Sequence, residues 1–241
     1  MRSRTRSAWA WVDAVTALKI LAHPDERLRE ISEPVTEFGD ELKTLVQDMV
    51  DTLEVKGGAG LAAPQIGFSK RVIVLRPKLF VEESPDASYS PDTWVLVNPV
   101  VRTSGSTQRW QEACLSVPMG TGLVDRHEEC EVKYQRLDGS EHTVTVKWPL
   151  SGGIQHEADH LNGILYLDRV GTMERSMITR KIEKLRRESD RRAEQKKQQE
   201  ILDLRGTKAL LKYRAEKSGK VAPDKRREKP RKKFGQQKKG K

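Results

Sequence analysis

The chain has 241 residues, and its 45 lysines and arginines against 35 aspartates and glutamates give a formal net charge of +10. This length fits one domain with appendages and is sufficient for a sizeable hydrophobic core. No apolar run approaches the length of a membrane span, and two cysteines do not make a disulfide framework, so we expect a soluble protein of a reducing compartment with no membrane partner.

Residues 1–16 form an N-terminal extension with an unusual charge pattern. Arg2, Arg4 and Arg6 alternate with serine and threonine, and no acidic residue occurs before Asp13. The pattern is similar to an organellar transit peptide. The segment is not a secretory signal, because it lacks the apolar core of one. A disordered extension or an upstream start codon is a simpler explanation, which we favour. The sequence thus predicts a cytoplasmic protein, with an organellar location as the alternative if residues 1–16 are a targeting segment.

Residues 39–55 predict an amphipathic helix. Apolar residues recur there at three- and four-residue spacing, namely Leu42, Leu45, Val46, Met49, Val50 and Leu53. The glycines at positions 57, 58 and 60 end the helix and start a loop whose backbone can approach a strand or a ligand closely. Residues 72–75 and 94–97 are short apolar runs typical of buried strands, and a proline-rich surface loop links them.

Residues 128–136 and 141–148 predict a β-hairpin, because both alternate in polarity and they flank the turn sequence Leu137-Asp138-Gly139-Ser140. Cys130 shares the apolar face of the first strand, so we expect it to be a small buried core residue. Together these elements predict an α+β fold, in which short, mostly antiparallel strands surround one central metal-binding helix.

That central helix is predicted by the stretch Ile154 to Gly163. His156 and His160 are four residues apart, which places both imidazoles on one helix face, where they can reach the same ion. Glu157 lies beside them and can handle the proton of an attacking water, so the stretch reads as the H-E-x-x-H pattern of metal-assisted hydrolysis. Gly163, which follows an asparagine, is a good helix stop.

A tetrahedral metal site needs a third protein ligand and an open fourth position. The chain offers Cys114 and Cys130 as thiolate candidates. Cys114 occurs in a polar, turn-like segment that ends at Pro118, which suits a ligand better than a core residue. We therefore expect Cys114, His156 and His160 to hold one divalent ion.

Three stretches resemble, in order, the motifs of the peptide deformylases. They are Gly58-Ala59-Gly60-Leu61-Ala62-Ala63-Pro64-Gln65, then Glu112-Ala113-Cys114-Leu115-Ser116, then Gln155-His156-Glu157-Ala158-Asp159-His160. The segment from Leu18 to Arg29 is also similar to the usual start of that family. The resemblance covers roughly residues 17–170, and we treat residues 17–171 as the catalytic domain. Three ordered motifs are far more specific than H-E-x-x-H alone.

The resemblance implies a metal-dependent hydrolase that removes the formyl group from the N-terminal formylmethionine of nascent polypeptides. It favours Fe2+ as the ion, whereas the ligand chemistry alone also fits Zn2+ or Ni2+. Glu157 is the expected general base, and the resemblance assigns stabilisation of the developing oxyanion to the Gln65 amide and the Leu115 backbone N–H. The substrate backbone is expected to lie as an added strand against Ala59, Gly60 and Leu61.

Two departures from the family pattern affect the site. Ala113 stands where the family usually has glycine, which bears on the placement of Cys114 and of the Leu115 N–H. Gly152 and Gly153 stand where the family usually has bulkier apolar residues within the metal helix. Glycine costs about 1 kcal/mol in a helix interior. Two interpretations stay open: the helix begins later in this chain, or the glycines widen the substrate pocket.

The C-terminal part of the chain is expected to form a charged helix over residues 172–205 and a disordered tail over 206–241. A short apolar stripe of Ile178, Ile182 and Leu185 should dock the start of the helix on the domain. The tail holds fifteen lysines and arginines against three acidic residues, whereas the rest of the chain has thirty against thirty-two. Such a basic segment favours polyanions, and we expect ribosomal RNA, hence the ribosome, as a partner.

Two other functions stay open. A zinc peptidase would use H-E-x-x-H on internal amide bonds, although such enzymes rarely place a thiolate on the metal. A catalytically altered deformylase-like protein would act mainly through its basic tail, although the chain retains the three ligands and the base.

Overall fold

The computed structural model describes residues 17–217 of the chain. The N-terminal extension, residues 1–16, and the part of the predicted disordered tail from 218 to 241 lie outside the described residues. The chain divides between Lys184 and Leu185 into two units, so the boundary falls later than the one expected at residue 171.

The first unit is built on one antiparallel sheet of five strands, ordered as they occur in the chain. The strands are β1 (Gly60–Ala62), β2 (Val72–Leu75), β3 (Trp94–Cys114), β4 (Val117–Gln135) and β5 (Glu141–Lys147). The α+β class and the antiparallel sheet are confirmed. The β4–β5 hairpin is present, with Gly139 in the left-handed region of its turn at φ +83°.

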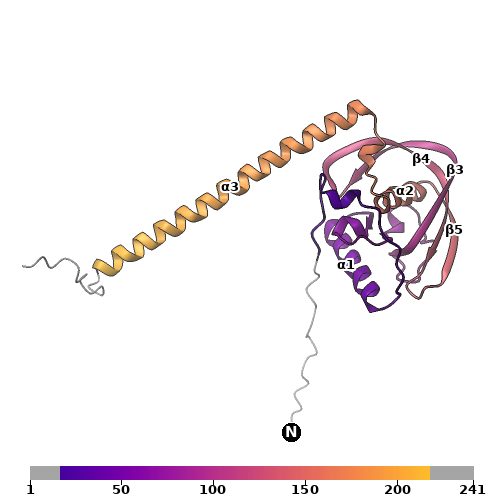
Figure 1. Ribbon diagram of the computed structural model, residues 1–241, viewed down its shortest axis with the longest axis horizontal. Coiled ribbons are helices and arrows are strands. Elements are labelled where there is room, and N and C mark those ends of the chain that lie inside the picture. The colour runs from indigo at the N-terminus through magenta and orange to yellow at the C-terminus, as the bar shows by residue number, and fades with distance from the viewer. Residues whose placement is uncertain (1–16, 218–241) are drawn as a thin grey trace, which may run out of the picture. The chain divides into compact units, whose positions relative to one another are not determined.

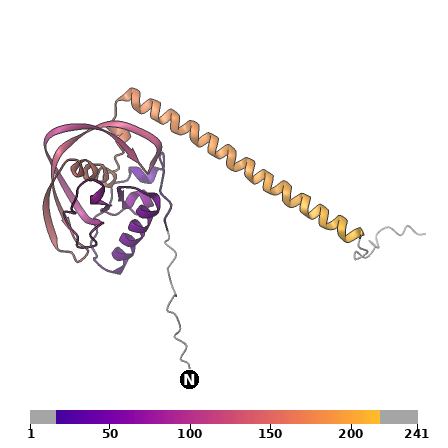
Figure 2. The same ribbon diagram turned by 180° about the vertical axis from the view of Figure 1, so that it is seen from behind.

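β3 and β4 are much longer than the expected short strands, with 21 and 19 residues. The middle part of β3 is largely exposed and polar on both faces, so it carries no apolar alternation that would mark a strand, whereas β4 alternates between buried and exposed residues. Ladder hydrogen bonds and cross-strand pairs such as Arg109 with Asp125 hold them together. In Figure 1 and Figure 2 these long strands curve around the central helix.

Two helices pack on this sheet. α1 (Asp40–Lys56) buries the apolar face predicted from its spacing, and Gly57 ends it in the left-handed region at φ +72°. α2 (Leu150–Leu161) is almost entirely buried within the curved sheet. Because α2 begins at Leu150, the interpretation that the metal helix starts later in this chain is wrong.

Cys130 is a core residue, as expected. It is fully buried among apolar side chains of the sheet and α2, including Ile154 and Trp94. Burial raises the pKa of its thiol to about 12, so the group stays protonated and unreactive near neutral pH.

The loop between β2 and β3 contains the short 3-10 helix η3 (Pro77–Leu79) and is anchored by Asp86. The Asp86 carboxylate accepts hydrogen bonds from the Tyr134 hydroxyl at 2.5 Å and from Arg136 Nε at 2.9 Å. Burial alone would raise the pKa of Asp86, but hydrogen bonds, above all from Arg136 and Tyr134, hold it at about 2. The loop is therefore fixed to β4 by a buried carboxylate.

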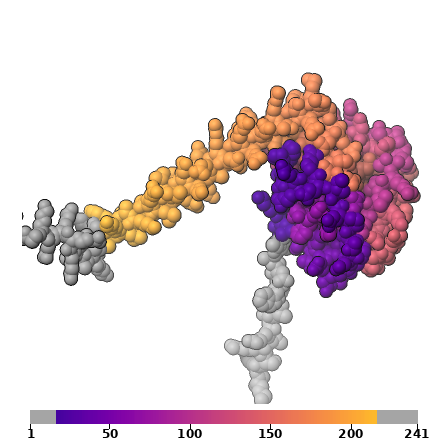
Figure 3. All heavy atoms as spheres, in the orientation of Figure 1, coloured from indigo at the N-terminus to yellow at the C-terminus, as the bar shows by residue number. Residues whose placement is uncertain are grey.

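The first described residues run over the surface of the body, where they appear in indigo in Figure 3. They include the 3-10 helix η1 (Glu26–Arg29). The Leu21 N–H donates to the Gln65 carbonyl at 2.8 Å, and the His23 N–H donates to the Ser116 carbonyl at 2.7 Å. The segment thereby ties together two loops that are far apart in sequence, one of which is the 3-10 helix η2 (Ala63–Ile66).

After α2 the chain passes through η4 (Tyr166–Asp168) into α3 (Thr172–Lys217). Ile178 and Ile182 are buried in a cluster with residues of β4 and η4, whereas Leu185 is half-buried. These contacts explain why the first turns of α3 belong to the first unit.

The second unit, in the part that the structure describes, is the remainder of α3 from Leu185. The helix extends to Lys217, so the expectation that residues 206–217 are disordered is wrong. Alanine and leucine at positions 209–211 favour a helix, which offsets the cost of about 1 kcal/mol at Gly206. Within residues 17–217 no helix is both long and apolar enough to cross a membrane.

Candidate metal centre

Cys114, His156 and His160 come together as the sequence predicts. Their ligand atoms all lie within 4.8 Å of one another, and Cys114 Sγ is 3.2 Å from His160 Nε2. The two imidazoles come from successive turns of α2, with ring centroids 5.1 Å apart. Cys114 is the last residue of β3 and does not lie in a turn-like segment, because the tight connection to β4 begins one residue later.

This donor set fits a divalent transition metal. His156 Nδ1 is 2.7 Å from a Glu112 carboxylate oxygen, which leaves Nε2 of this ring as the ligand atom. Burial lowers the pKa of His160 well below its ordinary value, so this imidazole stays neutral, as a metal ligand must be. One thiolate with two imidazoles matches the ligand preferences of Zn2+, Fe2+ and Ni2+.

Glu157 lies next to the ligands, with 5% of its surface exposed. Its Oε2 atom is buried and has no hydrogen-bond partner among residues 17–217. Burial raises the pKa of this carboxyl to about 7, which suits a group that must take up and release a proton near neutrality. Residue 60 must be small for the Glu157 carboxylate to keep this position, because a Cβ at Gly60 would lie 2.5 Å from Glu157 Oε1.

Gln65 is 1% exposed and points its amide toward the metal ligands. Its Oε1 accepts from the Ala62 N–H at 2.7 Å, which fixes the orientation of the amide. Its Nε2 lies 3.3 Å from Ser116 Oγ and 3.5 Å from Cys114 Sγ. The amide N–H donors therefore point toward Cys114 and Ser116.

A cavity of about 660 Å³ opens on these groups. Ala59, Gly60 and Leu115 line it, but Leu61 does not, because its side chain is fully buried in the core between α1 and the sheet. β1, which carries Gly60 and Leu61, stands at the edge of the sheet and pairs with β2 on one side. Of the three residues expected to bind the substrate backbone, Ala59 and Gly60 thus line the cavity, whereas the Leu61 side chain does not.

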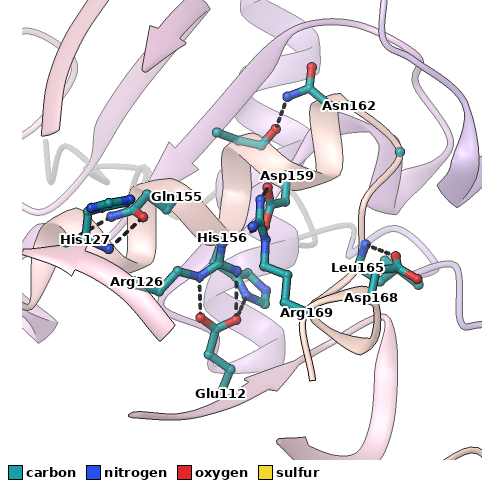
Figure 4. Close-up of polar contacts among 12 residues, drawn as sticks. Glu112, Arg126, His127, Gln155, His156, Asp159, Asn162, Leu165, Asp168 and Arg169 are labelled. Atoms are coloured by element: carbon teal, nitrogen blue, oxygen red, sulfur yellow. Dashed lines mark hydrogen bonds and ion pairs between the residues drawn. The ribbon is translucent and has the colours of Figure 1, made fainter. Parts of the chain in front are cut away.

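A buried ionic network contacts the His156 ligand through Glu112 (Figure 4). Arg126 Nε and Nη2 contact the Glu112 carboxylate at 2.6 and 3.0 Å, and its Nη1 contacts Asp159 at 2.6 Å. Asp159 also accepts two hydrogen bonds from Arg169. Burial would raise the pKa of Glu112, but hydrogen bonds from His156 and Arg126 hold it at about 2. The residue that orients His156 is therefore an ionised carboxylate.

This network and the aromatic side chains of the cavity were not evident from the sequence. Charged residues within alternating strands ordinarily face solvent, so Glu112 and Arg126 gave no signal of burial. Trp110 and Phe80 line the cavity from β3 and from the loop after η3. Their residue types alone do not distinguish a cavity wall from ordinary core packing.

The structure shows the surroundings of the residues that depart from the family pattern, namely Ala113 in β3 and the glycine pair in α2. Ala113 is an exposed residue of β3 paired with Thr121, and it does not adopt a positive φ, so the position does not require glycine. Gly152 and Gly153 are buried within α2, and the space beside them is filled by aromatic rings from other elements. Aromatic rings thus occupy the positions that side chains at 152 and 153 would take, while Gly153 itself still borders the cavity.

Comparison with known proteins identifies the family. The family model described as polypeptide deformylase matches residues 17–176. A peptide deformylase of Acidobacterium capsulatum is 40% identical over 168 residues, covering 70% of this chain and 95% of its own length. One of Pelagibacter ubique is 39% identical over 168 residues, covering 69% of this chain and 94% of its own length.

The fold agrees with these matches. The crystal structure of a peptide deformylase from Legionella pneumophila is similar with a TM-score of 0.64 at 38% identity, covering 73% of this chain and 99% of that one. The family model, the sequence relatives and the similar crystal structure agree, and the chain therefore belongs to the peptide deformylase family.

Proposed function

We propose that this deformylase removes the formyl group from N-terminal formylmethionine with one divalent ion held by Cys114, His156 and His160, and with Glu157 as general base. The observation that carries the proposal is the buried, unpartnered Oε2 of Glu157 beside the three ligand atoms. A bound divalent ion lowers the pKa of water toward about 7 and so supplies a nucleophile at neutral pH. Glu157 takes the proton of the attacking water and later gives it to the leaving amine.

Two donors are proposed to stabilise the oxygen of the formyl group as it gains charge. Gln65 Nε2 is held on the ligand side of its loop by the Ala62 contact, and the Leu115 N–H directly follows the Cys114 ligand. Loss of one such donor costs about 3–4 kcal/mol of transition-state stabilisation in other oxyanion holes. The contact of Gln65 Oε1 with the Ala62 N–H fixes the orientation of the amide before the substrate binds.

The substrate backbone is proposed to add to the outer edge of β1. This strand has free ladder positions on the side away from β2 within the described chain, and Ala59 and Gly60 border the cavity. An extended peptide there would present its first residue to the cavity and its formyl group to the ligands.

The test uses formyl-Met-Ala beside acetyl-Met-Ala and free Met-Ala, with the metal-loaded enzyme. Release of formate from the first peptide alone supports deformylation, whereas cleavage of internal amide bonds would indicate a peptidase. In the variant Glu157→Gln we expect full metal content and a loss of about 10²–10⁴ in kcat, because the proton acceptor is gone. Turnover at the wild-type rate in this variant would exclude Glu157 as the base.

The identity of the ion is proposed to be Fe2+, as the family resemblance favours. Apo-enzyme reconstituted under anaerobic conditions with Fe2+, Ni2+ or Zn2+ gives the comparison. We expect turnover with Fe2+ that is lost in air, where the ion oxidises. Retention of full activity in the native enzyme after exposure to air would contradict the Fe2+ assignment.

The basic C-terminal segment is proposed to bind ribosomal RNA, which would bring a cytoplasmic enzyme to its nascent substrate. Residues 206–241 hold fifteen basic and three acidic residues, and counterion release makes such contacts salt-dependent. Lys208 and Lys212 lie four residues apart on α3, so one helix face presents both charges. Co-sedimentation with ribosomes across a salt series compares the full chain with a chain ending at Arg205. Equal pelleting of both would exclude this segment as the tether.

Location is tested through the N-terminus. We propose a cytoplasmic protein, whereas removal of residues 1–16 from the mature chain, observed by N-terminal sequencing, would favour the organellar alternative.

A further inference from the structure

The turn of α2 that precedes the metal ligands carries no side chain on the cavity side. Gly152 is four residues before His156, and Gly153 is four residues before Glu157, so both glycines lie on the faces that carry these groups. Helical side chains lean toward the N-terminus of their helix, so residues at 152 and 153 would lie beside the floor of the cavity.

Aromatic rings from outside the helix occupy this space. A Cβ on Gly153 would lie 2.9 Å from Cζ of Phe80, and a Cβ on Gly152 would lie 2.9 Å from Trp148 and 3.2 Å from Trp110. Phe80 and Trp110 also line the cavity, as does Gly153. The Phe80 and Trp110 rings therefore occupy the space that side chains at 153 and 152 would take, and both border the cavity.

The two cavity-lining rings are held differently. Trp110 is fixed, because its indole N–H donates to Glu112 at 3.0 Å and its ring packs edge-on against Trp148 with centroids 4.8 Å apart. Phe80 directly follows η3 and is a half-buried apolar residue packed on the core of the sheet. The fixed ring belongs to the ligand-supporting network, whereas the Phe80 ring is held by packing against α2.

We propose that Phe80 is a specificity-determining residue that limits the size of the first substrate residue. Its ring takes the position that a side chain at residue 153 of α2 would otherwise occupy. This inference rests on the proposed function, because it concerns which formylated residue the same cavity accepts. The Phe80 ring and the missing side chain of Gly153 are complementary, so a change in one must be compensated by a change in the other. A flat aromatic wall also suits the thioether of methionine, since sulfur–aromatic contacts are favourable.

The test compares kcat/KM for formyl-Met-Ala and formyl-Phe-Ala in the metal-loaded wild type, Phe80→Ala, Gly153→Leu and the double variant. In Phe80→Ala we expect the ratio of formyl-Phe to formyl-Met to rise by about tenfold, because the wall is removed. Gly153→Leu alone should lower kcat/KM for both peptides. The double variant should bring the ratio back to within about threefold of wild type, because leucine then fills the space left by Phe80.

Leu79→Ala is the matched control. Leu79 precedes Phe80 in the chain, is 59% exposed and does not line the cavity, so the ratio should stay at the wild-type value. Phe80→Leu provides a second, conservative variant, for which we expect a smaller rise of about threefold. If Phe80→Ala does not fold, Phe80→Leu decides the question.

The outcomes separate this inference from the proposed function. An unchanged ratio in the Phe80 variants, with formyl-Met still turned over, overturns the inference and leaves the function intact. Effects of Phe80→Ala and Gly153→Leu that simply add in the double variant also overturn it, because complementary residues must couple. A wild-type enzyme that does not act on formyl-Met-Ala overturns the proposed function and, with it, the inference.

Discussion

Replacing Arg126 by methionine should destabilise the protein strongly. The Arg126 side chain is 2% exposed, and its guanidinium contacts the buried carboxylates of Glu112 and Asp159. Methionine has a similar volume, so the change leaves two buried carboxylates without their shared counter-ion. Breaking a buried ion pair in this way costs about 3–5 kcal/mol of unfolding free energy.

The same change should weaken metal binding by about 10–100-fold, because Glu112 would lose the contact that holds it against His156. Unfolding in urea with excess metal and a chelator competition measure the two effects. Arg109→Met is the control, since it removes an arginine from the same pair of strands. Its partner is Asp125, the two side chains are 67% and 53% exposed, and the expected cost is below about 1 kcal/mol. Losses of unfolding free energy within about 1 kcal/mol of each other in the two variants would refute the role assigned to the buried arginine.

Three further changes test other parts of the structure. Cys114→Ser should weaken metal binding at least about tenfold while Cys130→Ser keeps the metal, and equal losses in metal analysis would contradict the ligand assignment. Gly60→Ala should lower kcat about 100-fold with metal retained, because the new Cβ would lie 2.5 Å from Glu157 Oε1; an unaffected rate would show that the carboxylate can move without loss. Asp86→Asn should lower the unfolding free energy by about 1–2 kcal/mol at pH 7. The Asp86 pKa of about 2 lies below its value of about 4 in an unfolded chain, so this loss should fade as the pH falls from 4 to 2; a constant difference across a pH series would contradict the assignment.

The metal ligands were predictable because their chemistry is encoded locally. Helical spacing alone places His156 and His160 on one face, and residue type with motif order selects Cys114 over Cys130. The core face of α1 followed from the same kind of periodicity. In each case the signal lies within one element and does not depend on the partner that the element packs against.

The network behind the ligands was not predictable in the same way. Glu112 and Arg126 are 14 residues apart, and Asp159 is a further 33 away, so their meeting depends on the pairing of β3 with β4 and on the curvature around α2. The length of β3 was missed for a related reason, since its exposed middle part is held by ladder hydrogen bonds and not by an apolar face. The helical state of residues 206–217 was not predicted, because a high lysine content is typical of disordered tails, whereas the alanine and leucines at 209–211 favour a helix.

The separation of the ligands along the chain has a consequence during synthesis. Cys114 is made 42 residues before His156, so the thiol is present for a time without either imidazole. An ion can bind the full donor set only after the chain has been made past His160 and α2 has packed into the sheet, which couples metal loading to completed folding. Until then the Cys114 thiol is open to oxidation. A cell that lacks reductant would therefore lose this enzyme at the stage of assembly, before any ion has been bound.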